Sequence, residues 1–298
     1  MISLVITSFK EPHLVGKAID SLISQDINDP YELIVSAPDK ETQKVVKEYA
    51  RKFKQIKLFK DPGKGKTYAL NLLIPRLRGD IIILMDGDVY TSKNSIKLII
   101  NTFKDKKVGC ITGRPVSLNS RDNIFGYWSH LLCNAAHILR MKRAKKNLFL
   151  ECSGYLWAFK KEAISKIKKI PRETAEDTIV PILIYQKGFK IKYILDAEVY
   201  VRYPSNLKDF IEQKKRTAKA HETLSIFADL NSVPRMKSFK NELLGCLDVL
   251  KYPQSIKELF WTFLLFPVRL YIWLAAFFQR YIKKELKVDG WKQIESTK

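Results

Sequence analysis

The chain has 298 residues, of which 46% are apolar, so it is long and apolar enough for one large globular domain with an appendage and is not disordered in bulk. Its formal charge of +22 indicates either an anionic partner (nucleic acid, an acidic membrane or a phosphorylated substrate) or a lysine-rich solvated surface. Its four cysteines lack CxxC spacing, which argues against a disulfide framework or a zinc site and favours a reducing cytoplasm.

The first 85 residues alternate short apolar runs with amphipathic segments. We expect strands at 2–6, 32–35, 56–59 and 80–85, and helices at 14–24, 41–53 and 68–76. This alternation predicts an α/β fold with a mostly parallel central sheet flanked by helices. Because Met1 leads directly into the first strand, we expect no signal peptide. Ligands bind such sheets beyond the carboxyl ends of the strands, where residues 7–11 and 86–88 fall.

The pattern changes after about residue 117. We expect an amphipathic helix at 125–140, a partly strand-like run at 150–159, a helix after Arg172, loops and strands at 185–203, and a helix at 207–227. The aromatic residues Phe125, Tyr127 and Trp128 either line a sugar-binding wall or pack in the core. We predict a catalytic domain at residues 1–228 and a C-terminal helical region at 229–298.

Residues 259–278 form an apolar segment of about the length that a membrane crossing needs. Pro267 interrupts it and Arg269 lies near its middle. Its flanks are both basic, so the positive-inside rule assigns no direction; the flanking residues are Lys251, Lys257, Arg280, Lys283 and Lys284. A helix in the membrane interface, or a bent pair broken at Pro267, explains both flanks better than a crossing or packing on the protein itself. We therefore expect a protein that is peripheral on, or anchored to, the cytoplasmic face of a membrane.

Asp86-Gly87-Asp88 follows the clearest buried strand of the sequence. Two carboxylates around the smallest residue suit Mn²⁺ or Mg²⁺, which binds one or two carboxylates together with phosphate oxygens and water. The same triplet also forms ordinary turns. Its position after 81–85 favours a metal and nucleotide site.

Gly63-Lys64-Gly65-Lys66 precedes the helix before this strand. Glycines permit close approach to an anion, and lysines at a helix N-terminus favour phosphate. The spacing is not that of a Walker A loop, and a flexible solvated loop is an equal alternative.

Glu176-Asp177 stands near the start of the helix expected after Arg172. Acidic residues there commonly cap a helix or complement its dipole, and the local sequence favours this interpretation. The alternative is a general base, which a glycosyl transfer with inversion requires.

The ordered set of motifs resembles the family 2 glycosyltransferases, which have the GT-A fold. The resemblance covers about residues 1–225 and rests on Val5-Ile6-Thr7-Ser8-Phe9-Lys10-Glu11, Gly65-Lys66 followed by Ala69-Leu70-Asn71, Asp86-Gly87-Asp88, Ser153-Gly154, Glu176-Asp177 and Gln213-Lys214-Lys215-Arg216. It implies that the donor site contains Thr7, Ser8, Phe9, Glu11, Lys64, Lys66, Asp86, Gly154, Glu176, Gln213 and Arg216, with Asp86 and Asp88 near the metal.

The same resemblance implies that Asp177 is the catalytic base and that Gln213 and Arg216 match the polar positions of the QxxRW motif. Two departures stand out. The usual acidic pair after the second strand is replaced by Ser36-Ala37-Pro38-Asp39, so Asp39 is a shifted candidate for recognition of the base. Thr217 replaces the motif's tryptophan, which argues against a processive polymer synthase.

The sequence thus predicts an inverting, metal-dependent glycosyltransferase that uses a nucleoside diphosphate sugar, with UDP preferred, and a membrane-associated lipid or glycan acceptor. One alternative is a sugar nucleotidyltransferase, which would normally carry a glycine-rich signature after the first strand. Another is a basic scaffold that binds nucleic acid without catalysis, but no nucleic-acid-binding motif is visible, so we expect no nucleic-acid partner.

Overall fold

The computed structural model describes residues 1–165, 167, 169–236, 239–282 and 294–297. Its first part runs β1 (Ile2–Thr7), α1 (Val15–Ile23), β2 (Tyr31–Ala37), α2 (Lys40–Lys52), β3 (Ile56–Lys60), α3 (Lys66–Leu73), a 3₁₀ turn (Ile74–Arg76) and β4 (Ile81–Asp86). All the elements predicted for this part are confirmed, with slightly shifted ends.

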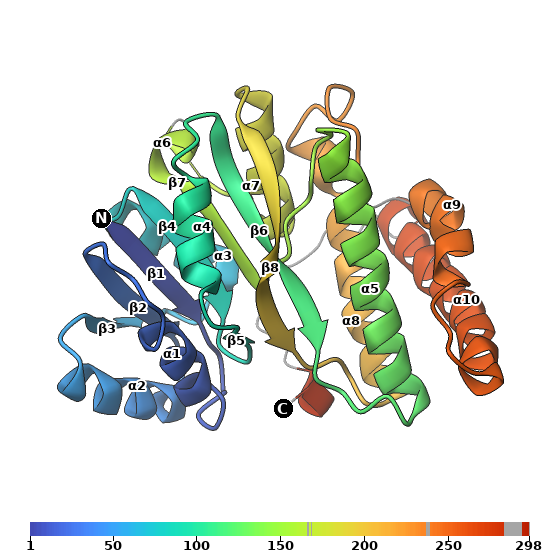
Figure 1. Ribbon diagram of the computed structural model, residues 1–298, viewed down its shortest axis with the longest axis horizontal. Helices are drawn as coiled ribbons and strands as arrows, with labels where there is room; N and C mark the ends of the chain where they lie inside the picture. The colour runs from blue at the N-terminus through green and yellow to red at the C-terminus, as the bar shows by residue number, and fades with distance from the viewer. Residues whose placement is uncertain (166, 168, 237–238, 283–293, 298) are drawn as a thin grey trace.

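The sheet has the strand order β3-β2-β1-β4-β7-β6-β8-β5 (Figure 1). Strands β1 to β4 are parallel, as predicted. β7 (Leu156–Lys160) then pairs antiparallel with β4 and with β6 (Val108–Ser117). β6 runs parallel to β8 (Lys190–Val201), and the short β5 (Tyr90–Thr91) is antiparallel to β8. The sheet is therefore mixed, and its parallel part is the N-terminal one.

Helices cover both faces of this sheet, as the strand pattern predicts. Because successive side chains of a strand point to opposite faces, Leu4 and Ile6 pack in one core and Val5 in the other. The first core includes α1, α2 and α4 (Ser95–Thr102), and the second includes α3, α6 (Lys161–Ile164) and α7 (Glu176–Gln186).

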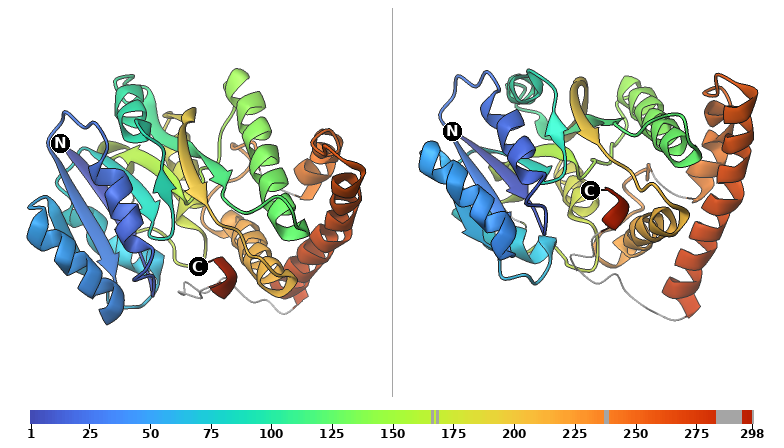
Figure 2. Two further views of the ribbon diagram at one scale, coloured as in Figure 1. Left: turned by 60° about the horizontal axis from the view of Figure 1, so that its bottom comes forward. Right: turned by 90° about the horizontal axis from the view of Figure 1, so that it is seen from below.

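A third core joins α5 (Ile124–Lys145), α8 (Leu207–Glu222) and α10 (Ile256–Phe277). The Tyr127 hydroxyl lies 2.6 Å from Thr262 Oγ1, and Trp128 Nε1 donates to the Trp261 carbonyl at 2.7 Å. Tyr127 and Trp128 thus pack in the core and hold α10. Helix α9 (Phe239–Val249) falls in the region 229–298 that the sequence predicts to be helical, although its bounds were not predicted, and it lies beside α10 (Figures 1 and 2).

Helix α10 is continuous, so the bent pair broken at Pro267 is wrong: the proline lies inside a single helix. Ser255 caps it by accepting from the Glu258 N–H at 3.2 Å. Its mean hydropathy is 1.7, and by length and composition alone it is long and apolar enough to cross a membrane. Lys283 and Lys284 of the predicted basic flank lie outside the described residues. The short turn Glu295–Thr297 lies against α8, where Ser296 N–H donates to Asp209 Oδ2 at 3.2 Å (Figure 2).

Candidate active site

The parallel register of β1 and β4 places Thr7 directly beside Asp86, where both strands end. The Thr7 carbonyl accepts from Gly87 N–H at 2.8 Å, and Thr7 Oγ1 donates to Asp86 Oδ1 at 3.3 Å. A Cβ at Gly87 would lie only 2.4 Å from the Ser8 Cβ. Glycine is therefore required for the turn to pack this closely, and the turn brings Asp86 and Asp88 to the wall of a cavity.

Three carboxyl groups, Glu11, Asp86 and Asp88, share this wall. Burial, together with the charge of Asp88, raises the pKa of Glu11 to about 8, although Ser8 Oγ donates to Glu11 Oε2 at 2.7 Å. Burial and the charge of Asp86 likewise raise the pKa of Asp88 to about 7. Each carboxylate thus makes its neighbour harder to ionise, which is the environment that a cation relieves.

The donor set fits a hard divalent cation bound partly by substrate. Asp86 and Asp88 supply carboxylate oxygens at the cavity wall. Within the described residues, no group of three His, Cys, Asp or Glu side chains is arranged to hold a metal by itself. Mg²⁺ commonly takes one or two carboxylates and completes its octahedron with phosphate oxygens and water, so two aspartates suffice for a cation that arrives with a diphosphate.

Lys66 connects three elements at the centre of the site. It follows Gly65, whose φ of 110° suits glycine, and begins α3. Its Nζ lies 2.6 Å from Asp86 Oδ1 on β4 and 2.8 Å from Glu176 Oε1 on α7. Burial alone would lower the pKa of Lys66, but the two carboxylates raise it well above its ordinary value. The lysine is therefore held charged between Asp86 and Glu176.

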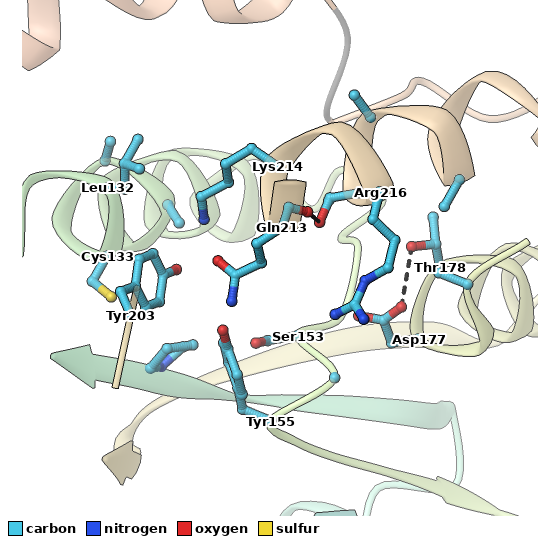
Figure 3. A pocket seen from close by; sticks show the side chains of 18 of the residues that line it. Leu132, Cys133, Ser153, Tyr155, Asp177, Thr178, Tyr203, Gln213, Lys214 and Arg216 are labelled. Atoms are coloured by element: carbon cyan, nitrogen blue, oxygen red, sulfur yellow. Dashed lines mark hydrogen bonds between the residues drawn. The ribbon is translucent and has the colours of Figure 1, made fainter. Parts of the chain in front are cut away.

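Asp177 lies in the first turn of α7, next to Glu176, the ion-pair partner of Lys66. The N-cap residue, Ala175, makes no side-chain capping bond, and Glu176 forms an ion pair instead of a cap. A Cβ at Gly154 would come within 3.1 Å of Asp177 Oδ2, so the missing side chain makes room for this carboxylate. Thr178 Oγ1 donates to Asp177 Oδ1 at 3.4 Å (Figure 3).

Helix α8 closes the site opposite the sheet. Figure 3 shows Arg216 pointing toward Asp177, and Gln213 pointing toward Tyr155. The Gln213 side-chain oxygen is buried and has no hydrogen-bond partner among the described residues, so it is able to accept from a ligand. The ammonium of Lys214 lies 4.1 Å from the centre of the Tyr203 ring.

The cavity has a volume of about 580 Å³ and unites most of the predicted site. The predicted residues that line it are Thr7, Phe9, Glu11, Lys66, Asp86, Asp88, Gly154, Glu176, Asp177, Gln213 and Arg216. They come from β1, α3, β4, α7, α8 and the connecting loops, so elements up to 209 residues apart in sequence meet here.

Three predicted residues do not line the cavity. Ser8 supports Glu11, as described above. Asp39 caps α2 by accepting from Thr42 N–H at 2.9 Å and accepts from Lys10 N–H at 2.7 Å. The ammonium of Lys64 lies 5.6 Å from the centre of the Tyr68 ring.

The cavity is also lined by Tyr155, Tyr203 and Arg140, which the sequence analysis did not assign to the site, and by Lys214, which it named only as part of the motif at 213–216. Burial and the charge of Asp88 raise the pKa of Tyr155 well above its ordinary value, so it stays a neutral hydroxyl. Its one sequence signal was its place directly after Ser153-Gly154. Tyr203, at the end of β8, carried no such signal.

Comparison with known proteins gives a consistent result. A family model described as "Glycosyltransferase like family 2" matches residues 1–220. An N-acetylglucosaminyltransferase of Rhizobium meliloti (strain 1021) is 25% identical over 243 residues, which cover 74% of this chain and 55% of that protein. The probable glycosyltransferase YdaM of Bacillus subtilis (strain 168) is 24% identical over 74% of this chain and 55% of its own length. The chain thus spans about half the length of the curated relatives it matches.

Solved structures show the same fold. The mannosyltransferase PcManGT from Pyrobaculum calidifontis, in complex with GDP-Man and Mn²⁺, has a TM-score of 0.68 at 18% identity, covering 95% of this chain and 88% of its own. S. aureus TarS 1–349 in complex with UDP-GlcNAc has a TM-score of 0.52 at 14% identity, covering 95% and 92%. These likenesses confirm the predicted GT-A fold, a mixed sheet flanked by helices.

Proposed function

Since the chain belongs to the glycosyltransferase-like family 2, we propose that it transfers a sugar from a nucleoside diphosphate sugar to an acceptor hydroxyl, with inversion at the anomeric carbon. The observation that carries this proposal is that one cavity is lined both by Asp86, Asp88 and Lys66 and by Asp177. A direct displacement needs a charged diphosphate site and a base that reach the same anomeric carbon, and residues suited to both roles line this cavity.

The donor's diphosphate would lie near the end of β4. A divalent cation, Mn²⁺ or Mg²⁺, held by Asp88 with Asp86, would neutralise the leaving nucleoside diphosphate. Thr7 at the end of β1, and Phe9 and Glu11 after it, line the cavity and would border the base and ribose. UDP-sugars are our first choice and GDP-sugars the second, and the two structural neighbours contain UDP-GlcNAc and GDP-Man, respectively.

Asp177 would take the proton. As the acceptor oxygen attacks the anomeric carbon, its hydroxyl proton moves to an Asp177 carboxylate oxygen and the bond from that carbon to the diphosphate breaks. Arg216, whose guanidinium points toward Asp177 (Figure 3), is also close enough to Asp88 for its charge to oppose the rise in the pKa of that carboxyl, so it would stabilise negative charge on the departing phosphate. Lys66 already neutralises Asp86 and Glu176, so its role is to hold the β4 and α7 ends of the site together.

The acceptor would be a membrane-associated lipid or glycan. Helix α10 exposes a continuous apolar face to solvent, formed by Phe260, Phe263, Leu270, Leu274 and Phe277; we call it the α10 outer face. An apolar face of this length beside exposed lysines is typical of proteins that lie on an anionic membrane. We accordingly propose a catalytic domain at 1–228 and a membrane-associated region at 229–298, on the cytoplasmic side.

A thermal-shift screen of nucleotide-sugars with and without Mn²⁺ tests the function. A ligand that binds the folded protein stabilises it by about 2.7 kcal/mol at a hundredfold excess over its Kd. We expect one class of donor to raise the melting temperature when Mn²⁺ is present and to have little effect with EDTA. Absence of any donor effect, together with retention of RNA in an electrophoretic shift assay, would favour the nucleic-acid-binding alternative.

A further inference from the structure

The cavity extends beyond Asp177 into a branch between α5 and the pair α9–α10. On the α5 side its wall is formed by Leu132, Ala135, Ala136 and Leu139. These residues stand at positions i, i+3, i+4 and i+7, which is the spacing of a helix face that normally packs in a core. Here that face is only half-buried and borders open space.

The opposite wall comes from α9 and α10. It contains Gly245 and Val249 of α9, and Leu265, Phe266 and Trp273 of α10. A Cβ at Gly245 would meet no described atom within 4 Å, and the glycine shows no positive φ that would require it. Glycine inside a helix costs about 1 kcal/mol relative to alanine. The absence of a side chain at Gly245 therefore leaves the branch wide without serving any turn or close contact.

Arg269 is the one charged residue in the apolar stretch 259–278 of the sequence, and its charge is neutralised within this branch. Arg269 Nε and Nη2 donate to Glu242 at 2.5 and 2.7 Å, and Trp273 Nε1 donates to the same carboxylate at 2.7 Å. Burial would raise the pKa of Glu242, but the hydrogen bonds from Arg269 hold it below its ordinary value, so the pair stays ionised. The branch also has polar lining residues: Asn241 and Asp248 of α9, and Lys142 of α5, whose Nζ donates to Asp248 Oδ2 at 2.6 Å. Toward the active site the branch reaches Gln213 and Lys214.

Helix α10 presents apolar residues on two opposite sides. Its inner side lines the branch with Leu265 and Trp273, whereas its outer face leaves Phe260 61% and Leu274 59% exposed. A lipid surface against the outer face would lie about one helix diameter, or about 10 Å, from the branch. Exposed Lys251 and Lys257 at the start of α10 favour an anionic surface there.

We propose that the branch binds the hydrocarbon chain of an amphiphilic acceptor that enters from a membrane on the α9–α10 side. The chain lies between α5 and α9–α10, and the polar end, which carries the accepting hydroxyl, passes Gln213 and reaches Asp177. Gly245 determines the width of this branch. The inference rests on the proposed glycosyl transfer and specifies the acceptor. The acceptor has one hydrocarbon chain, which lies inside the branch, and a head group that carries the accepting hydroxyl.

Alkyl β-D-glucosides of eight, nine and ten carbons, each below its micelle concentration, serve as probes. Titration calorimetry on the full chain should show that affinity rises by roughly fourfold for each added CH₂ that the branch buries. Gly245→Phe should remove this dependence because the ring fills the branch, whereas Gly245→Ala, the size control, should retain it. Ala136→Phe repeats the blockade from α5 in case the first variant does not fold, which melting curves will reveal.

Two results would overturn the inference. One is affinity that does not change with chain length in the unaltered protein, which would favour a purely glycan acceptor. The other is chain-length dependence that persists in folded Gly245→Phe and Ala136→Phe, which would place the chain on the α10 outer face instead. Mn²⁺-dependent stabilisation by a nucleotide-sugar in the unaltered protein is recorded in parallel. If it is present, the proposed glycosyl transfer survives either result; if it is absent, the transfer itself is wrong.

Discussion

The sheet with its loops and the helix pair α9–α10 differ in how completely they bury their large apolar side chains. Among the described part of residues 1–203, the exposed large apolar side chains are Met1, Leu148 and Leu195. Helix α10 exposes them along its whole length, from Ile256 to Phe277. The first region completes its own core, whereas the second presents apolar surface that the described protein leaves uncovered.

Charge follows the same contrast. At the sheet edge, Lys66 forms ion pairs with Asp86 and Glu176, and two further carboxyl groups of the same cavity, Glu11 and Asp88, have raised pKa values. In α10 the charged Arg269 is held by a single carboxylate, Glu242. Buried carboxyl groups with raised pKa values are typical of a site that binds a charged substrate. An apolar helix whose Arg269 is neutralised by Glu242 is suited to contact with an apolar phase. The difference agrees with our proposal that the two regions bind different parts of one reaction: the donor at the sheet, and the acceptor's apolar part at α9–α10.

The largest expected effect concerns the sheet region. Asp177→Asn keeps the shape of the side chain but removes the proton acceptor, so transfer should fall about 100- to 10,000-fold. Donor binding should persist, because Asp86, Asp88 and Lys66 are untouched. Turnover is measured with the donor found in the thermal-shift screen, and donor affinity by titration.

Asp196→Asn is the matched control, since Asp196 is exposed on β8 and outside the cavity. It should behave like the unaltered protein. Near-normal turnover of Asp177→Asn would show that the carboxylate is not the base, and α7 would then contribute only Glu176 to the site.

The second effect concerns α10. Phe263→Gln combined with Leu274→Gln removes two side chains that are 52% and 59% exposed on the outer face. Burial of each such side chain in lipid contributes about 1.5–3 kcal/mol, so binding to vesicles of phosphatidylglycerol and phosphatidylcholine should weaken by at least about a hundredfold. Co-sedimentation with the vesicles measures it.

The control replaces two exposed leucines of the sheet region, Leu148→Gln with Leu195→Gln. Equal loss of vesicle binding in both double variants would show that the α10 outer face contributes no more to membrane binding than the sheet region does. Unchanged binding in the α10 variant would mean that the outer face is covered by something other than lipid.

The sequence predicted the parallel half of the fold better than the rest, for a physical reason. Strands such as β1 and β4 are buried on both faces and therefore appear as continuous apolar runs. β6 has Gly109, Gly113 and Pro115 in its length, and such residues are typical of turns rather than strands. Its irregular register with β8 accommodates them, which only the folded sheet reveals.

Prediction of the site shows the same limit. Asp86 and Asp88 were predicted from a short motif after a buried strand, whereas Asp177 was implied by the family resemblance because its local sequence favoured a helix cap; the cavity brings all three together. Tyr203 and the branch beside Gly245 result from helices and strands that pack together over long sequence distances, and no local pattern encodes them. The local sequence favoured helix capping as the role of Glu176 for a similar reason. Its ion-pair partner, Lys66, lies 110 residues away in sequence, so no local pattern reveals the pair.

A third and smaller effect is the dependence of stability on pH. The pKa of Asp88 is raised from 3.8 to about 7, so between these values the folded protein keeps a proton that the unfolded chain has lost. This contribution to stability is complete below about pH 4 and is lost as pH rises through 7. With EDTA present, the free energy of unfolding should therefore fall between about pH 4 and 7, by no more than about 1.4 kcal/mol per pH unit for each proton.

Asp88→Asn binds no such proton and should flatten the profile; Glu11, whose pKa is raised to about 8 partly by Asp88, should also lose part of its shift. Urea titrations at each pH measure the effect. Parallel profiles for the two proteins would show that Asp88 ionises as easily as an exposed aspartate, and the electrostatic contrast between the sheet edge and α10 would disappear.

The smallest effect tests how tightly the base is positioned. In Gly154→Ala the added Cβ would lie 3.1 Å from Asp177 Oδ2, so the carboxylate must move by a few tenths of an ångström. A displacement of this size should lower the rate of transfer roughly tenfold while donor affinity is maintained, because only the base moves. Gly16→Ala makes a similarly tight contact, 3.3 Å from the Tyr49 hydroxyl; neither Gly16 nor Tyr49 lines the cavity, so this variant should leave transfer unchanged. If both variants transfer at the normal rate, the Asp177 carboxylate can move more freely than its packing against Gly154 implies. Close positioning of side chains in the site would then be limited to the ends of β1 and β4.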